Sequence, residues 1–226
     1  MIWSDFRESG TMRKTHLGVL SVMCLLAACG GGGGASSSDP VIPGPATPGT
    51  SDPDPLTGIR ADATDLLSDW APDGVPAYTA LSVVPTTGAA TYEGYLYGDL
   101  STDGGAATDS LIGALRLTAT FAAESVDFIG SATDFTDQRD DPLTGTLTIS
   151  GGRLNRTGNP ASDATLRGIS VVGTLRDADG TALDLGLQLE GDFLGITAQA
   201  LGGEAIGRVT VGSSSQDFDG GFIAAE

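Results

Sequence analysis

Alternation of apolar and polar residues constrains the fold of this chain more than any other feature of its sequence. Residues 182–190 read Ala-Leu-Asp-Leu-Gly-Leu-Gln-Leu-Glu, so four leucines fall on one face of an extended strand and three polar side chains fall on the other. Residues 143–150 alternate apolar residues or glycine with hydroxyl residues in the same way. A period of two with one polar face indicates an antiparallel sheet that is buried on one side and hydrated on the other.

Eight segments are predicted to be strands and to form a single closed sheet. Hairpin turns are expected between them: Asp179-Gly180 is typical of a two-residue turn in which both residues take positive φ, and Ala122-Ala123 and residues 212–215 lie at other reversals. Eight antiparallel strands favour an all-β, up-and-down β-barrel without exposed sheet edges, and a β-sandwich is the main alternative. The strands are placed near residues 90–99, 110–120, 124–135, 143–151, 165–176, 181–191, 203–211 and 216–224.

The barrel is expected to be soluble rather than membrane-spanning. A barrel that crosses a membrane carries an apolar outer band with aromatic girdles at both interfaces. Only 6% of this chain is aromatic, and its last residues are Ala-Ala-Glu. The leucine- and glycine-rich face therefore fits a filled interior.

The first thirty residues contain a second informative pattern. A basic stretch (13–16) and an apolar run (17–26) precede the sequence Leu-Ala-Ala-Cys-Gly at 26–30. This is the layout of a bacterial secretory signal, and the apolar run is shorter than the roughly 20 residues that a spanning helix needs. The sequence around Cys29 resembles a lipobox. We therefore expect residues 1–28 to be a signal peptide and Cys29 to be lipidated.

A flexible tether and a short N-terminal segment are expected between Cys29 and the barrel domain (90–226). Residues 29–58 are rich in glycine, serine and proline, which predicts a disordered linker with an r.m.s. span of about 30 Å. Residues 59–89 form the N-terminal segment, which begins with a helix over 59–70 and continues as an extended stretch. That helix would place five apolar residues on one side: Ile59, Ala63, Leu66, Leu67 and Trp70.

Two details concern the start of the chain and its destination. Asp5 and Glu8 do not fit a basic leader, so translation is expected to start at Met12. Gly30, rather than an aspartate, follows Cys29, which favours the outer membrane over retention at the inner membrane and leaves both the surface and the periplasmic face of the outer membrane open.

Composition argues against most catalytic chemistry and against nucleic acid. The net charge is −18, so anionic lipid heads and nucleic acid would be repelled. His16 is the only histidine, and the two cysteines (Cys24 in the leader, Cys29 at the anchor) leave no thiol pair for a disulfide. We expect no enzyme activity, no cofactor and no metal.

Several residue clusters invite a functional interpretation, but each has a simpler one. The acidic residues of 177–184 suggest Ca²⁺, yet the spacing is not that of an EF-hand, and a hairpin turn explains it better. Asp127 and Asp134 could form a carboxylate pair but are expected to face water. The acidic loop 136–142 is interpreted as a solvated connection.

Tyrosines and arginines form two further clusters. Tyr95 and Tyr97 share a strand face opposite Tyr92, so they are expected to line the barrel wall or to pack against the N-terminal segment. Arg153 and Arg156 are interpreted as a small solvated basic loop.

Motifs in the last strands resemble those of transferrin-binding protein B barrels. They are residues 190–195 (Glu-Gly-Asp-Phe-Leu-Gly), 202–207 (Gly-Gly-Glu-Ala-Ile-Gly) and the ending 217–226, together with 90–97 and 125–128. Factor H-binding protein shares that barrel. The resemblance implies a single eight-stranded barrel with a handle-like segment, on an outer-membrane lipoprotein. The residues that contact transferrin do not map onto this chain.

The sequence thus predicts a non-enzymatic, surface-exposed outer-membrane lipoprotein, anchored through Cys29, whose barrel binds a protein partner. A carrier of a small apolar ligand and a structural envelope lipoprotein are the alternatives.

Overall fold

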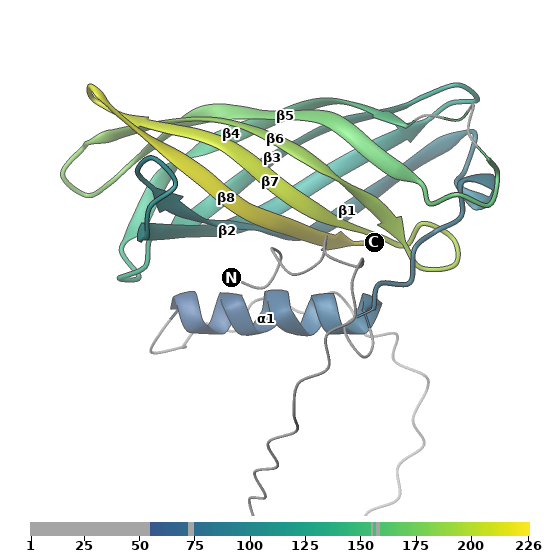
Figure 1. The fold of residues 1–226 in the computed structure, drawn as a ribbon, viewed down its shortest axis with the longest axis horizontal. Coiled ribbons are helices and arrows are strands. Elements are labelled where there is room, and N and C mark those ends of the chain that lie inside the picture. Colours follow the sequence, from purple (N-terminus) through teal and green to yellow (C-terminus); the bar gives the residue numbers. More distant parts are fainter. Residues whose placement is uncertain (1–54, 72–74, 155, 157–158) are drawn as a thin grey trace, which may run out of the picture. The chain divides into compact units, whose positions relative to one another are not determined.

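The computed structural model describes residues 55–71, 75–154, 156 and 159–226, and these residues form a ring of strands preceded by a helix. Each strand pairs antiparallel with the next, and the last pairs with the first, so the ring is a closed eight-stranded barrel (Figure 1). The predicted all-β barrel is confirmed. Its strands are β1 (Gly88–Ser101), β2 (Ala107–Phe121), β3 (Val126–Thr136), β4 (Pro142–Leu154), β5 (Thr165–Arg176), β6 (Ala182–Leu194), β7 (Ala200–Val211) and β8 (Ser214–Ala225).

Two segments precede the barrel. Helix α1 (Pro55–Trp70) starts four residues before the predicted helix, with proline as its first residue, where the missing N–H costs nothing. The 3₁₀ turn η3 (Leu81–Val83) interrupts the extended stretch. The predicted signal peptide, Cys29 and the linker up to residue 54 lie outside the described residues.

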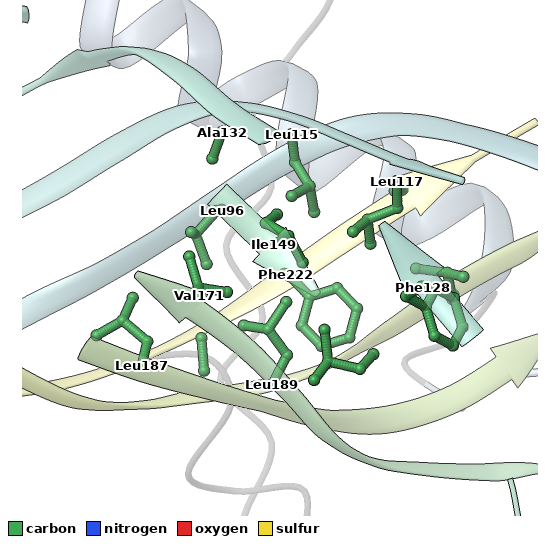
Figure 2. Packing of buried hydrophobic residues seen from close by; sticks show 14 of the residues in the cluster. Leu96, Leu115, Leu117, Phe128, Ala132, Ile149, Val171, Leu187, Leu189 and Phe222 are labelled. Carbon is green, nitrogen blue, oxygen red and sulfur yellow. The ribbon is translucent and has the colours of Figure 1, made fainter. Parts of the chain in front are cut away.

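The alternation of the sequence translates into an apolar interior. Inward side chains from all eight strands form one continuous buried cluster, in which Leu96, Leu117 and Phe222 are at most 2% exposed. Figure 2 shows leucine, isoleucine and phenylalanine side chains from different strands pointing toward one another. Outward positions of β4 carry exposed threonines, as the pattern predicted.

Four aromatic rings fill the barrel near the ends of β2 and β6. The ring centroid of Phe193 lies 5.8 Å from that of Phe121 and 6.2 Å from those of Tyr92 and Phe128. The Tyr92 hydroxyl donates a hydrogen bond to the carbonyl oxygen of Ala198 (2.7 Å), and burial raises the pKa of this phenol. The interior is therefore occupied by side chains at this end.

The turn between β5 and β6 differs from the expected two-residue hairpin. The connection spans Asp177–Thr181, and of Asp179 and Gly180 only the glycine takes positive φ (+82°). Gly180 N–H donates to the Asp177 carbonyl (3.0 Å), and Asp177 Oδ1 accepts from Thr181 N–H (2.8 Å). In this five-residue connection, Asp179 does not need the positive φ that a two-residue turn requires. The prediction of a two-residue hairpin turn at Asp179-Gly180 was therefore wrong.

The acidic connection between β3 and β4 is also more ordered than a solvated loop. Asp137 is only 4% exposed. Its carboxylate accepts hydrogen bonds from the Arg139 N–H (2.8 Å), the Arg139 Nη2 (2.8 Å) and the Asp141 N–H (3.0 Å). Burial alone would raise the pKa of Asp137, but these hydrogen bonds outweigh it and the pKa is lowered.

Replacing Asp137 by asparagine is expected to reduce the free energy of unfolding by about 1–3 kcal/mol at pH 7, because charge-assisted hydrogen bonds are lost. A carboxyl whose pKa is lowered by folding stabilises the protein above its unfolded pKa of about 3.9, and this stability is lost as the pH falls through the folded value. Urea unfolding at several pH values should therefore show a smaller loss of stability on acidification in the variant. Asp103→Asn, in the exposed β1–β2 loop, is the control that should change little.

Helix α1 packs on the outside of the barrel. Ala63, Leu66, Leu67 and Trp70 form a cluster with Tyr95 and Ile223 and with three further outer-wall residues: Leu194, Ala200 and Ala225. Ile223 is 0% exposed although its neighbours Phe222 and Ala224 occupy the inward positions. The expected packing of Tyr95 against the N-terminal segment is thus confirmed.

Candidate functional site

Residues 77–82, which follow α1, are hydrogen-bonded both to the end of β6 and to the β4–β5 connection, at one end of the barrel. Thr79 N–H donates to the Phe193 carbonyl at the end of β6 (2.8 Å), and the Thr79 carbonyl accepts from Ala164 N–H (3.0 Å). Leu81 N–H then donates to the Ser162 carbonyl in the β4–β5 connection (2.8 Å). Residues 77–82 are therefore held between β6 and the β4–β5 connection at this end of the barrel, where Leu81 joins the buried core.

A groove opens where this segment meets the outer wall. Its volume is about 880 Å³, within the range of about 300–1,000 Å³ that is typical of ligand sites. We call it the outer groove. It is lined by residues of η3, of the β4–β5 connection and of strands β4, β5 and β6: Leu81, Arg153, Ser162, Asp163, Thr165, Arg167, Gly168 and Glu190.

Local backbone irregularities shape this part of the wall. β4 passes through Gly151 and Gly152, both with positive φ, before it reaches Arg153. In β5, Arg167 and Gly168 together lie between the pairs Leu166–Gly191 and Ile169–Leu189, so two residues of β5 oppose Glu190 alone. Such β-bulges redirect side chains and are frequent next to binding sites.

The two arginines of the outer groove face each other across neighbouring strands. Arg153 of β4 is the register partner of Arg167 of β5, so their Cβ atoms are roughly 5 Å apart. Both side chains are exposed. Like charges placed directly opposite each other destabilise a sheet, so this pairing costs stability.

Neither of these arginines has a partner among the described residues, whereas the other described arginine side chains do. Arg116 forms an ion pair with Glu93 (2.6 Å), Arg139 with Asp137 (2.8 Å) and Arg208 with Asp217 (3.6 Å). The other two donate to backbone carbonyls: Arg176 to Gly180, and Arg156 to Val84 and Pro85. In a chain of net charge −18, two adjacent arginines without a carboxylate partner stand out.

Two carboxylates complete the charge pattern of the outer groove. Glu190 lies across the bulge from Arg167, and Asp163 lies in the β4–β5 connection beside Ser162 and Thr165. No ion pair joins either carboxylate to an arginine within the described part of the chain. The groove thus has a cationic wall on β4 and β5, and its anionic edge consists of Glu190 on β6 and Asp163 in the β4–β5 connection.

The candidate residues singled out from the sequence have different locations. Arg156 is not a solvated loop residue: it anchors the segment at Val84 and Pro85, and burial lowers the pKa of its guanidinium. Asp127 and Asp134 are both exposed and lie about 20 Å apart along β3, too far to act as a pair.

The turn at Asp177–Thr181 uses its carboxylate in its own hydrogen bonding, which supports the turn interpretation. In the described residues, no group of three or more His, Cys, Asp or Glu side chains could hold a metal ion. Cys29, the predicted lipidation site, is outside the described part of the chain.

Comparison with protein-family models, with curated proteins and with solved structures finds no match. Among the helices that the structure describes, none is both long and apolar enough to cross a membrane.

Proposed function

We propose that this chain is a lipoprotein of the outer membrane, anchored through Cys29, whose barrel binds a protein partner at the cell surface without catalysis. The lipobox-like sequence at residues 26–30 supports the anchor. The barrel motifs that resemble those of transferrin-binding protein B support the assignment to a binding module, and the partner's identity does not follow from them.

The observation that carries the proposal is the filled interior of the barrel. Buried side chains from every strand meet inside it, and the aromatic cluster around Phe193 occupies the end next to the outer groove. A carrier of a small apolar ligand would need an apolar cavity there. Recognition is therefore assigned to the outside, where the outer groove and the exposed residue Val83 (48%) lie together at one end.

Site-specific photo-crosslinking in the native cells tests this function. A benzophenone side chain introduced at Ser162 or at Val83 is expected to give one discrete protein adduct, which mass spectrometry identifies. The matched control is Thr210, exposed near the other end of β7, which should give none. The same chain carrying Cys29→Ser should lose both membrane fractionation and the adduct. Absence of a discrete adduct at both Ser162 and Val83 contradicts the proposed function.

A further inference from the structure

The two arginines of the outer groove indicate a site for an anion. They lie opposite each other at a cost in stability, and neither has a partner among the described residues. Cross-strand repulsion between Arg153 and Arg167 would be relieved by a carboxylate beside them, yet neither Glu190 nor Asp163 forms an ion pair with them among the described residues. Binding sites commonly retain arrangements that are unfavourable in the free protein.

We propose that Arg153 and Arg167 bind a compact oxyanion, a carboxylate or a phosphate group, in the outer groove. A guanidinium presents several N–H donors in a plane and binds such groups through two parallel hydrogen bonds. Two guanidiniums on adjacent strands can hold one oxyanion between them, and this would replace their mutual repulsion by attraction. The hydroxyl group of Ser162 lines the same groove and adds a polar donor, whereas the Thr165 hydroxyl donates its proton to Asp192 Oδ1 (2.6 Å).

The anionic edge of the groove restricts what can enter. Glu190 and Asp163 would repel a second negative charge, so a single oxyanion is favoured over a polyanion such as nucleic acid. This inference rests on the proposed function, because it names the group that a protein partner presents: a carboxylate of an acidic side chain. A free phosphate has the same chemistry and is separated from the carboxylate by the experiment.

The test uses the full-length chain carrying Cys29→Ser, so that it can be purified without acylation. Backbone amide resonances of Thr165 and Gly168 are followed by NMR during titration with N-acetyl-glutamate amide and, separately, with inorganic phosphate at constant ionic strength. Saturable shifts are expected at these residues. Arg153→Gln or Arg167→Gln should weaken binding by about tenfold or more, because a charge-assisted hydrogen bond is lost.

Matched controls separate anion recognition from loss of charge or of folding. Arg116→Gln removes the same charge from an ion pair on β1 and β2 and should bind both probes as the unsubstituted protein does. The unfolding temperature of Arg153→Gln is expected to be unchanged or raised, since repulsion is relieved. A response to the carboxylate assigns the group to a partner side chain, and a response to phosphate alone assigns it to a free or phospho-linked oxyanion.

Equal shifts in all variants, or no saturable shift with either probe, would overturn the inference. The photo-crosslinking result is independent of this outcome: an adduct at Ser162 without oxyanion binding removes the inference and leaves the proposed function. Oxyanion binding without any crosslinked adduct would leave the oxyanion site in place and contradict the proposed binding of a protein partner.

Discussion

Replacing Gly203 by alanine is expected to prevent stable closure of the barrel wall between β6 and β7. A Cβ atom at this position would lie 2.0 Å from the Glu190 carbonyl oxygen and 2.4 Å from the Gly191 Cα. Both are backbone atoms of the neighbouring strand, so no side-chain rotation relieves the contact. We expect a loss of at least about 3 kcal/mol in the free energy of unfolding, the upper end of the cost of overpacking, measured by urea denaturation with circular dichroism.

Gly186 provides a matched control on the same pair of strands. Nothing lies within 4 Å of a Cβ built there, and the residue is exposed. Gly186→Ala is therefore expected to be neutral or to stabilise by up to about 1 kcal/mol, since alanine restricts the unfolded chain. Equal stability of the two variants would contradict the tight approach of β6 and β7 at Gly203.

Truncation of Phe193 to alanine is expected to cost about 3–5 kcal/mol, the range for a buried phenylalanine. Its side chain is 0% exposed, and its ring lies within 6.2 Å, centroid to centroid, of the three other rings of the aromatic cluster. Small domains are stable by only about 5–15 kcal/mol, so this single change removes a large part of the total. Chemical denaturation of the purified variant measures it.

The conservative variant Phe193→Leu distinguishes loss of packing from loss of the backbone contacts of this residue. Leucine keeps much of the volume and should cost clearly less than alanine. The Phe193 carbonyl, which accepts from Thr79 N–H, is unchanged in both variants. If both variants lost the same stability, the aromatic cluster would not be a tightly packed part of the core.

The sequence predicted the ring of strands because its local signals agree with one another. The leucines of 182–190 alternate without a break, and each predicted strand corresponds to one observed strand. The strand ends were less accurate where glycine interrupted the pattern. Gly202 and Gly203 delayed the expected start of β7, which begins at Ala200, since glycine contributes nothing to an alternating pattern.

The candidate site could not be predicted because it depends on pairing between strands rather than on a local motif. Gly151 and Gly152 end the alternating pattern of β4, so the sequence predicts a loop at Arg153, whereas β4 in fact extends to Leu154 and Arg153 lies in the barrel wall. Nothing in the pattern of β5 distinguishes Arg167 from an ordinary exposed strand residue. Only the register of β4 against β5 places the two arginines opposite each other, and only residues 77–82 complete the groove.

The order in which the strands pair has a consequence for biosynthesis. β8 supplies hydrogen-bond partners to both β7 and β1, with Ala225 opposite Glu93, so β8 completes the ring. While the polypeptide is being elongated, β1 and β7 would be the free borders of an open sheet, and such borders readily recruit other chains. A chain of this protein is consequently exposed to aggregation until β8 is in place, and loss of β8 would make that exposure permanent.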